Sequence, residues 1–180
     1  MIETVYKLSI GNDYRVSSDP YTTFTEEYAG ENINDIPHII DVVLTRLNLE
    51  LRGQRISSFK DEEMAILRTL TVKQIFQIYT SIVSANNLAN VAMNQLHEPV
   101  DNGYSNAYKH FYMAFGIARA VGADTEERFM AAHEARENGL GTQMDSNNNA
   151  YALYIFRNNL AGSNFISYSF LTGLAQSGQL

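Results

Sequence analysis

The sequence contains no cysteine and no tryptophan among its 180 residues. The absence of cysteine excludes disulfide bonds, thiolate metal sites and a cysteine nucleophile. Basic residues are also few, since 13 Lys and Arg stand against 20 Asp and Glu, for a net charge of -7. Nucleic-acid binding relies on clustered Lys and Arg, and here these residues are scattered, so we expect no nucleic-acid partner.

Long hydrophobic runs are absent as well. No stretch approaches the ~20 consecutive apolar residues of a transmembrane helix, so we expect no transmembrane segment. The first residues, Met1 to Thr4, contain neither the basic nor the apolar region of a cleavable signal peptide. We therefore expect a soluble protein that is either cytoplasmic or secreted without a classical signal peptide. Its 45% hydrophobic residues are enough for an ordinary core.

The spacing of the apolar residues is helical over most of the chain. Helices are predicted over residues 34–53, 60–68, 71–96, 103–121, 124–137, 147–160 and 164–175. The asparagines at 86, 87 and 90 predict a break or kink in the longest of them. Residues 1–33 alternate loosely and contain turn residues, which indicates a short extended or hairpin N-terminal arm. The expected fold is mainly α, a single compact helical domain of about six to seven helices over residues 34–180.

Two histidines are predicted to meet on neighbouring helices. On a helical wheel of residues 104–121, Asn106 and His110 fall among the apolar side chains, one turn apart. The connection Gly122-Ala123 is a tight turn, so the helices on either side should be antiparallel neighbours. His110 lies 12 residues before Gly122 and His133 lies 11 after it, which places both roughly 16–18 Å from the turn. We therefore expect both imidazoles in one pocket.

Two carboxylates accompany this pair. Glu134 follows His133 directly, and Asp145 follows a glycine-containing segment. The position of Asp145 has two interpretations, as a residue of the site or as the N-cap of the next helix. Asp124 with Glu127 three residues later is typical of an N-cap and its partner.

Three kinds of chemistry remain open for this cluster. The string from His133 to Glu137 has the H-E-x-x spacing of zinc hydrolases but ends in glutamate, so a divalent metal is one alternative. Metal-free acid–base catalysis by a histidine or by a carboxylate pair is the second. A buried hydrogen-bonded network in a non-enzymatic binding or structural module is the third. The candidate metal ligands are His110, His133, Glu137 and Asp145.

Three motifs, taken in order, resemble those of a family of uncharacterised bacterial domains. They are Asn106-Ala107-Tyr108-Lys109-His110, Ala132-His133-Glu134, and Met144-Asp145 followed by Asn148-Asn149. That family occurs at the C-terminal ends of secreted and polymorphic-toxin-type proteins, and the resemblance covers about residues 102–157. The Gly-Arg that usually follows is replaced by Ala152-Leu153, and Arg157 comes one turn later.

The resemblance implies a bacterial context of effector or toxin type, in which envelope components are the expected substrates and a cognate immunity or delivery protein is the expected partner. The His/Glu/Asp cluster itself favours a hydrolase. The expected catalytic residues are His110, His133, Glu134 and Asp145. The expected substrate-binding residues are Asn106, Asn148, Asn149 and Arg157. The alternative is a binding module in which the same residues form a structural network.

Overall fold

A computed structural model describes residues 20–27, 38–97, 103–135, 139–161 and 166–180, and every structural statement below concerns these residues. Within these ranges the regular structure is helical and no strand is present, which confirms the mainly α fold class. The helices are α2 (Pro20–Glu27), α3 (Ile39–Gly53), α4 (Asp61–Leu67), α5 (Val72–Leu96), α6 (Tyr104–Val121), α7 (Ala123–Glu134), α8 (Leu140–Arg157) and α9 (Tyr168–Gln176). None of them is both long and apolar enough to cross a lipid bilayer.

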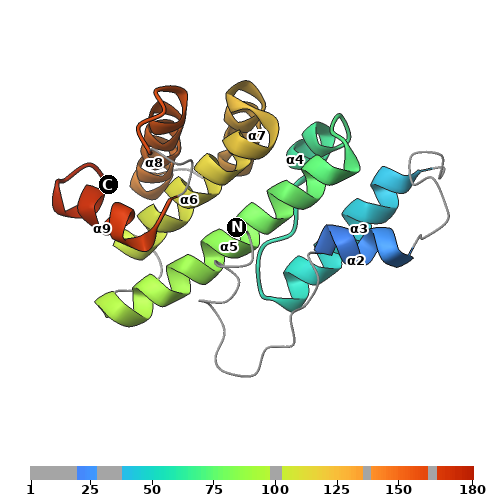
Figure 1. Cartoon of the computed structure of the whole chain (residues 1–180), viewed down its shortest axis with the longest axis horizontal. Coiled ribbons are helices and arrows are strands. Elements are labelled where there is room, and N and C mark those ends of the chain that lie inside the picture. The colour runs from blue at the N-terminus through green and yellow to red at the C-terminus, as the bar shows by residue number, and fades with distance from the viewer. Residues whose placement is uncertain (1–19, 28–37, 98–102, 136–138, 162–165) are drawn as a thin grey trace.

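Helices α5 and α6 form the centre of the molecule and run along each other in opposite directions (Figure 1). Their close approach depends on Gly116 of α6, where an added Cβ would lie 2.7 Å from Ser81 Oγ of α5. The predicted break in α5 is wrong, because the helix continues through the asparagines. Asn86 remains compatible with the helix because its side-chain amide donates a hydrogen bond to the carbonyl of Ile82.

Helices α2 and α3 pack against α5 at one end of the molecule (Figure 1). The predicted extended arm is wrong for residues 20–27, which form α2. Phe24 explains this difference, because its side chain is fully buried and its ring lies 5.3 Å from that of Phe76 on α5. The helix gains this tertiary contact, which local patterning does not reveal. The other residues of the expected arm lie outside the described ranges.

Helices α6 and α7 form the predicted hairpin around Gly122, whose φ of 87° suits glycine. Gly122 is the N-cap of α7, so the predicted capping pair of Asp124 and Glu127 is wrong. The helix ends at Glu134, and Glu137 lies outside the described residues. Helix α4 packs against α7, and α8 packs against both α6 and α7.

Helix α8 begins at Leu140, seven residues before the predicted start at Asn147. Its N-cap is Gly139, which has a φ of 126° and so permits the sharp change of chain direction that a side chain would oppose. Asp145 therefore lies inside α8 and is not its N-cap. The earlier start places Asp145 on the face of α8 that packs against α6, where it is 7% exposed.

Candidate functional site

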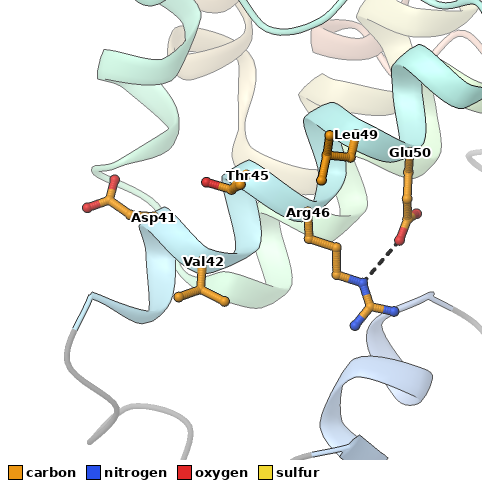
Figure 2. A pocket seen from close by; sticks show the side chains of 6 residues that line it. All are labelled: Asp41, Val42, Thr45, Arg46, Leu49 and Glu50. Carbon is orange, nitrogen blue, oxygen red and sulfur yellow. Dashed lines mark hydrogen bonds and ion pairs between the residues drawn. The ribbon is translucent and has the colours of Figure 1, made fainter.

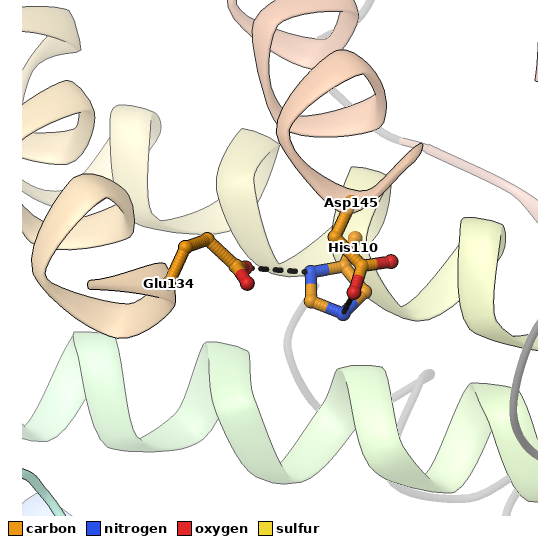
Figure 3. Close-up of side chains that lie close together, drawn as sticks. All are labelled: His110, Glu134 and Asp145. Atoms are coloured by element: carbon orange, nitrogen blue, oxygen red, sulfur yellow. Dashed lines mark ion pairs between the residues drawn. The ribbon is translucent and has the colours of Figure 1, made fainter. Parts of the chain in front are cut away.

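The site is centred on His110, which is 3% exposed on α6. Its ring lies between two carboxylates that come from different helices (Figure 3). Nδ1 is 3.4 Å from Oε1 of Glu134 at the end of α7, and Nε2 is 3.3 Å from Oδ2 of Asp145 on α8. Three sequence segments thus meet at one imidazole, and each of the three side chains is at least nine-tenths buried.

Two asparagines hold these carboxylates. The amide of Asn106 donates a hydrogen bond of 2.7 Å to Oδ1 of Asp145. The amide of Asn149 donates a weaker one of 3.4 Å to Oε1 of Glu134. Asn106 precedes His110 by four residues and Asn149 follows Asp145 by four, so each helix presents two polar side chains on one face. The asparagines predicted to bind substrate therefore orient the carboxylates of the cluster.

Two buried polar atoms of the cluster have no partner at good hydrogen-bond geometry. They are Nδ1 of His110, for which Glu134 is near but poorly aligned, and Oδ1 of Asn149. A buried polar atom without a partner costs about 1–3 kcal/mol, so such atoms are uncommon in folded proteins and need a reason. Both atoms belong to the same cluster, which makes this part of the molecule chemically unsatisfied.

The environment favours the neutral form of His110. Burial is the main cause that lowers the pKa of His110 to about 3, and electrostatic repulsion from Lys109 and from the protonated form of His133 lowers it further. A weak side-chain hydrogen bond with Asn149 raises the pKa and so acts in the opposite direction. The ring is therefore uncharged at neutral pH, and one of its nitrogens keeps a lone pair.

His133 lies beside this cluster, as the hairpin geometry predicted, with its ring centre 6.2 Å from that of His110. The carboxylate partner of His133 is neither Glu134 nor Asp145. Nδ1 of His133 lies 2.7 Å from Oε1 of Glu63, a residue of α4 that is only 2% exposed. The His133 side chain is 23% exposed, so it is the member of the group that solvent reaches most easily.

The Glu63–His133 pair is fixed at both ends. The second oxygen of Glu63 accepts a hydrogen bond from the backbone N–H of Lys60 at the start of α4. The side-chain amine of Lys60 in turn donates to the backbone carbonyl of His133. Helices α4 and α7 are therefore connected by two polar contacts at the same place, and the orientation of the His133 ring follows from them.

Comparison with family models gives one match, described as a domain of unknown function (DUF6973), over residues 68–177. The match covers more than half of the chain. The chain belongs to the DUF6973 family. Among curated proteins and among solved structures, no match to this chain was found.

The DUF6973 region contains His110, His133, Glu134 and Asp145, but Glu63 lies before it. Glu63 was also missed by the sequence analysis. Its position in the charged string from Lys60 to Glu63 is typical of the solvated first turn of a helix. One signal was available, because Glu63 and the buried Leu67 are four residues apart and so share the inner face of α4.

The remaining predicted residues lie in different surroundings. Asn148 is 7% exposed on α8, next in sequence to Asn149. Arg157 is also on α8, but twelve residues after Asp145, which is about 18 Å along a helix. Its guanidinium lies 3.0 Å from Glu127 and 3.6 Å from Asp124 on α7. Arg157 therefore connects the end of α8 to the start of α7. It does not lie in the cluster around His110.

A shallow hollow lies elsewhere, on the outer face of α3 (Figure 2). It is lined by Asp41, Val42, Thr45, Arg46, Leu49 and Glu50. Arg46 and Glu50 pair across its edge at 3.1 Å, as expected for residues four apart on a helix. None of the predicted site residues lines this hollow, and α3 lies outside the DUF6973 match.

Proposed function

We propose that this chain is a hydrolase in which His133 is the general base and Glu63 is its positioning residue. The observation that carries the proposal is the 2.7 Å contact between Nδ1 of His133 and a buried carboxylate. An ionised carboxylate can only accept a hydrogen bond, so Nδ1 carries the proton and Nε2 keeps the lone pair. This is the tautomer that a histidine needs in order to accept a proton from water.

The reaction begins when Nε2 of His133 takes a proton from a water molecule. That water attacks the electrophilic carbon of the substrate, and the protonated His133 then returns the proton to the leaving group. The carboxylate of Glu63 stabilises the imidazolium that exists between these two steps. The same carboxylate fixes the direction of the ring, and general-base catalysis of this kind contributes about 10²–10⁴-fold to a rate.

The cluster around His110 supplies the electrostatic environment beside this base. Its two carboxylates stabilise positive charge that develops nearby, and they are already oriented by asparagine amides. Glu134 follows His133 in the chain, which makes it the cluster residue best placed for a second acid–base role.

The effector or toxin type of this hydrolase is proposed from the order of the three motifs. This context favours envelope components as the substrate class. A bacterium that makes such an enzyme needs protection from it, so a cognate immunity protein is the proposed partner.

The proposal is tested with His133→Gln and Glu63→Gln in the full chain. Hydrolysis is measured on dye-labelled peptidoglycan, phospholipid vesicles and a chromogenic ester, and growth is followed when the protein is directed to the bacterial periplasm. We expect His133→Gln to lower the hydrolysis rate by about 10²-fold or more and to relieve growth inhibition. Glu63→Gln should lower the same rate and shift its pH profile, because the amide no longer stabilises the imidazolium.

Asp61→Asn is the matched control, since Asp61 is an exposed carboxylate on the same helix as Glu63. It should leave the rate and the pH profile unchanged. Unaltered hydrolysis in His133→Gln would remove the catalytic assignment.

A non-enzymatic structural network is the second candidate function, favoured by the burial of His110, Glu134 and Asp145. In that case no hydrolysis is found with any of the substrates, and the substitutions change only the melting temperature. Measuring stability and hydrolysis in the same variants therefore separates the two functions.

A further inference from the structure

Three ligand-type atoms converge in the cluster around His110. One ring nitrogen of His110 and one carboxylate oxygen each from Glu134 and Asp145 lie within 4.8 Å of one another. Nδ1 lies 3.4 Å from an oxygen of Glu134 and Nε2 lies 3.3 Å from an oxygen of Asp145, so either nitrogen already has one carboxylate nearby. Binding of one ion requires the second carboxylate to turn toward the same nitrogen.

We propose that His110, Glu134 and Asp145 bind one divalent transition-metal ion. The ion takes one nitrogen of the ring and one oxygen from each of the two carboxylates. The side-chain oxygen of Asn149 provides a further donor, because it is buried and its amide nitrogen is already committed to Glu134.

The unpartnered atoms of the site support this assignment. Nδ1 of His110 and Oδ1 of Asn149 have no partner at good hydrogen-bond geometry although both are buried. A lone pair on nitrogen that faces a carboxylate oxygen is repelled by it unless a proton or a cation lies between them. A bound cation removes this repulsion and satisfies both orphaned atoms at once.

The surrounding contacts are those of an outer ligand shell. Asn106 donates to one oxygen of Asp145 and leaves the other oxygen turned toward His110. Hydrogen bonds of this kind orient metal ligands, and their removal typically weakens metal binding about 10–100-fold. The pairs Asn106/His110 and Asp145/Asn149 place this shell on two rigid helix faces.

The donor set indicates which class of ion fits. It contains imidazole nitrogen and carboxylate oxygen, and the chain has no cysteine to provide thiolate. Such a set suits Zn²⁺ or Mn²⁺, whereas Ca²⁺ and Mg²⁺ prefer oxygen ligands alone. The ligands differ from those predicted from sequence, because His133 is paired with Glu63 and Glu134 takes its place.

Metal binding is tested on the full chain after treatment with a chelator. Zn²⁺, Mn²⁺ and Ca²⁺ are titrated separately by calorimetry, and Co²⁺ is used as a visible-absorption probe for a site with nitrogen and oxygen ligands. We expect one Zn²⁺ or Mn²⁺ per chain and a melting temperature that rises with metal concentration, since the ion binds only the folded state. Tighter binding of Ca²⁺ than of Zn²⁺, or no saturable binding, overturns the proposal.

Three variants locate the site. Asp145→Asn should weaken binding by about 100-fold or more, and Asn106→Ala, which keeps every ligand, should weaken it about 10-fold. Asn147→Ala is the matched control, because Asn147 is an exposed residue of α8 and should bind metal as the parent does. Equal affinity in Asp145→Asn and the parent overturns the assignment. If circular dichroism shows that Asp145→Asn does not fold, the metal affinities of Asn106→Ala and Asn147→Ala decide. Equal affinities of these two variants would then overturn the assignment.

The metal proposal and the hydrolase proposal can fail separately. His133→Gln should lose hydrolysis and still bind one ion per chain, because His133 is not one of the ligands. Hydrolysis that depends on His133 in a protein that binds no metal would overturn only the metal proposal. Metal binding in a protein that hydrolyses none of the substrates would overturn only the hydrolase proposal.

Discussion

Glu126 is a carboxylic acid in the first turn of α7 whose side chain is fully buried. Neither of its oxygens has a hydrogen-bond partner. Burial is the main cause that raises the pKa of Glu126 from 4.5 to about 8, and the charge of Glu127 raises it further, while Arg157 opposes both. The folded state therefore holds a proton that the unfolded state releases. The stabilisation from this proton is complete below about pH 4.5 and is lost as the pH rises through about 8.

The substitution Glu126→Gln should remove this pH dependence. Each unit of pKa shift corresponds to about 1.4 kcal/mol, so the variant should gain a few kcal/mol relative to the parent between about pH 5 and about pH 9. The measurement is the free energy of unfolding in urea at both pH values. Asp61→Asn is the control, because this carboxylate is exposed on α4, is not among the groups that shift the pKa of Glu126, and should keep the slope of the parent. An unchanged slope in Glu126→Gln would contradict the assignment.

At the residue scale, the sequence predicts the polar positions that lie on apolar helix faces. His110 was identified because it falls within the apolar arc of its helix. His133 was identified because it lies about as far from the tight turn as His110 does. Glu63 was not identified, because its burial depends on the docking of α4 against α7. That contact joins residues seventy positions apart, and the spacing of Glu63 and Leu67 on α4 indicates a shared face but not the partner.

At the scale of the elements, the α5–α6 contact depends on the lack of a side chain at Gly116. A Cβ there would lie 2.7 Å from Oγ and 3.0 Å from Cβ of Ser81, both closer than ordinary contacts. Ser81 has little freedom to move away, because its hydroxyl donates to the carbonyl of Gln77. The two helices therefore approach at this point through glycine, and the residues of the site on α6 depend on that approach for their position.

Gly116→Ala should accordingly destabilise the fold by about 1–3 kcal/mol, the usual cost of overpacking. Gly173→Ala is the matched control in α9, where an added Cβ meets nothing within 4 Å, and it should gain up to about 1 kcal/mol from helix propensity. Thermal melts of both variants, together with Ser81→Gly/Gly116→Ala, measure the coupling. If Ser81→Gly fails to relieve the cost of Gly116→Ala, the close contact is not its cause.

The first and last residues of the helices were predicted less well from the sequence than the presence of the helices. Helices α4, α5 and α6 begin and end within a residue of their predicted bounds, because apolar spacing and capping residues agree there. Helix α8 begins earlier because its first turns contain glycine and polar residues that are typical of a loop. Asp145 looked like a cap for the same reason. In the structure its carboxylate contacts Asn106 and His110 from inside the helix, so it does not cap the helix start.

At the scale of the whole molecule, the family match is smaller than the folding unit. The match begins at residue 68, after α2, α3 and α4. Helix α3 nevertheless contributes fully buried side chains to the core that it shares with α5, namely Val43, Leu44, Leu47 and Leu51. The segment before the match therefore supplies both core and, through Glu63, one member of the proposed catalytic pair.

A chain shortened to residues 68–177 should therefore fail to unfold cooperatively. Burial of a leucine or valine side chain contributes about 1.5–3 kcal/mol, and the loss of four of them on α3 is comparable with a total stability of about 5–15 kcal/mol. The apolar face of α5 that α3 covers would be exposed, so the shortened chain should bind a hydrophobic dye and show a broad melt by circular dichroism. A chain of residues 38–180 keeps α3 and α4, loses only Phe24 and the rest of the N-terminal segment, and should melt cooperatively at a lower temperature. Equal melting of residues 68–177 and the full chain would mean that the family region folds alone and that α3 is not needed for its core.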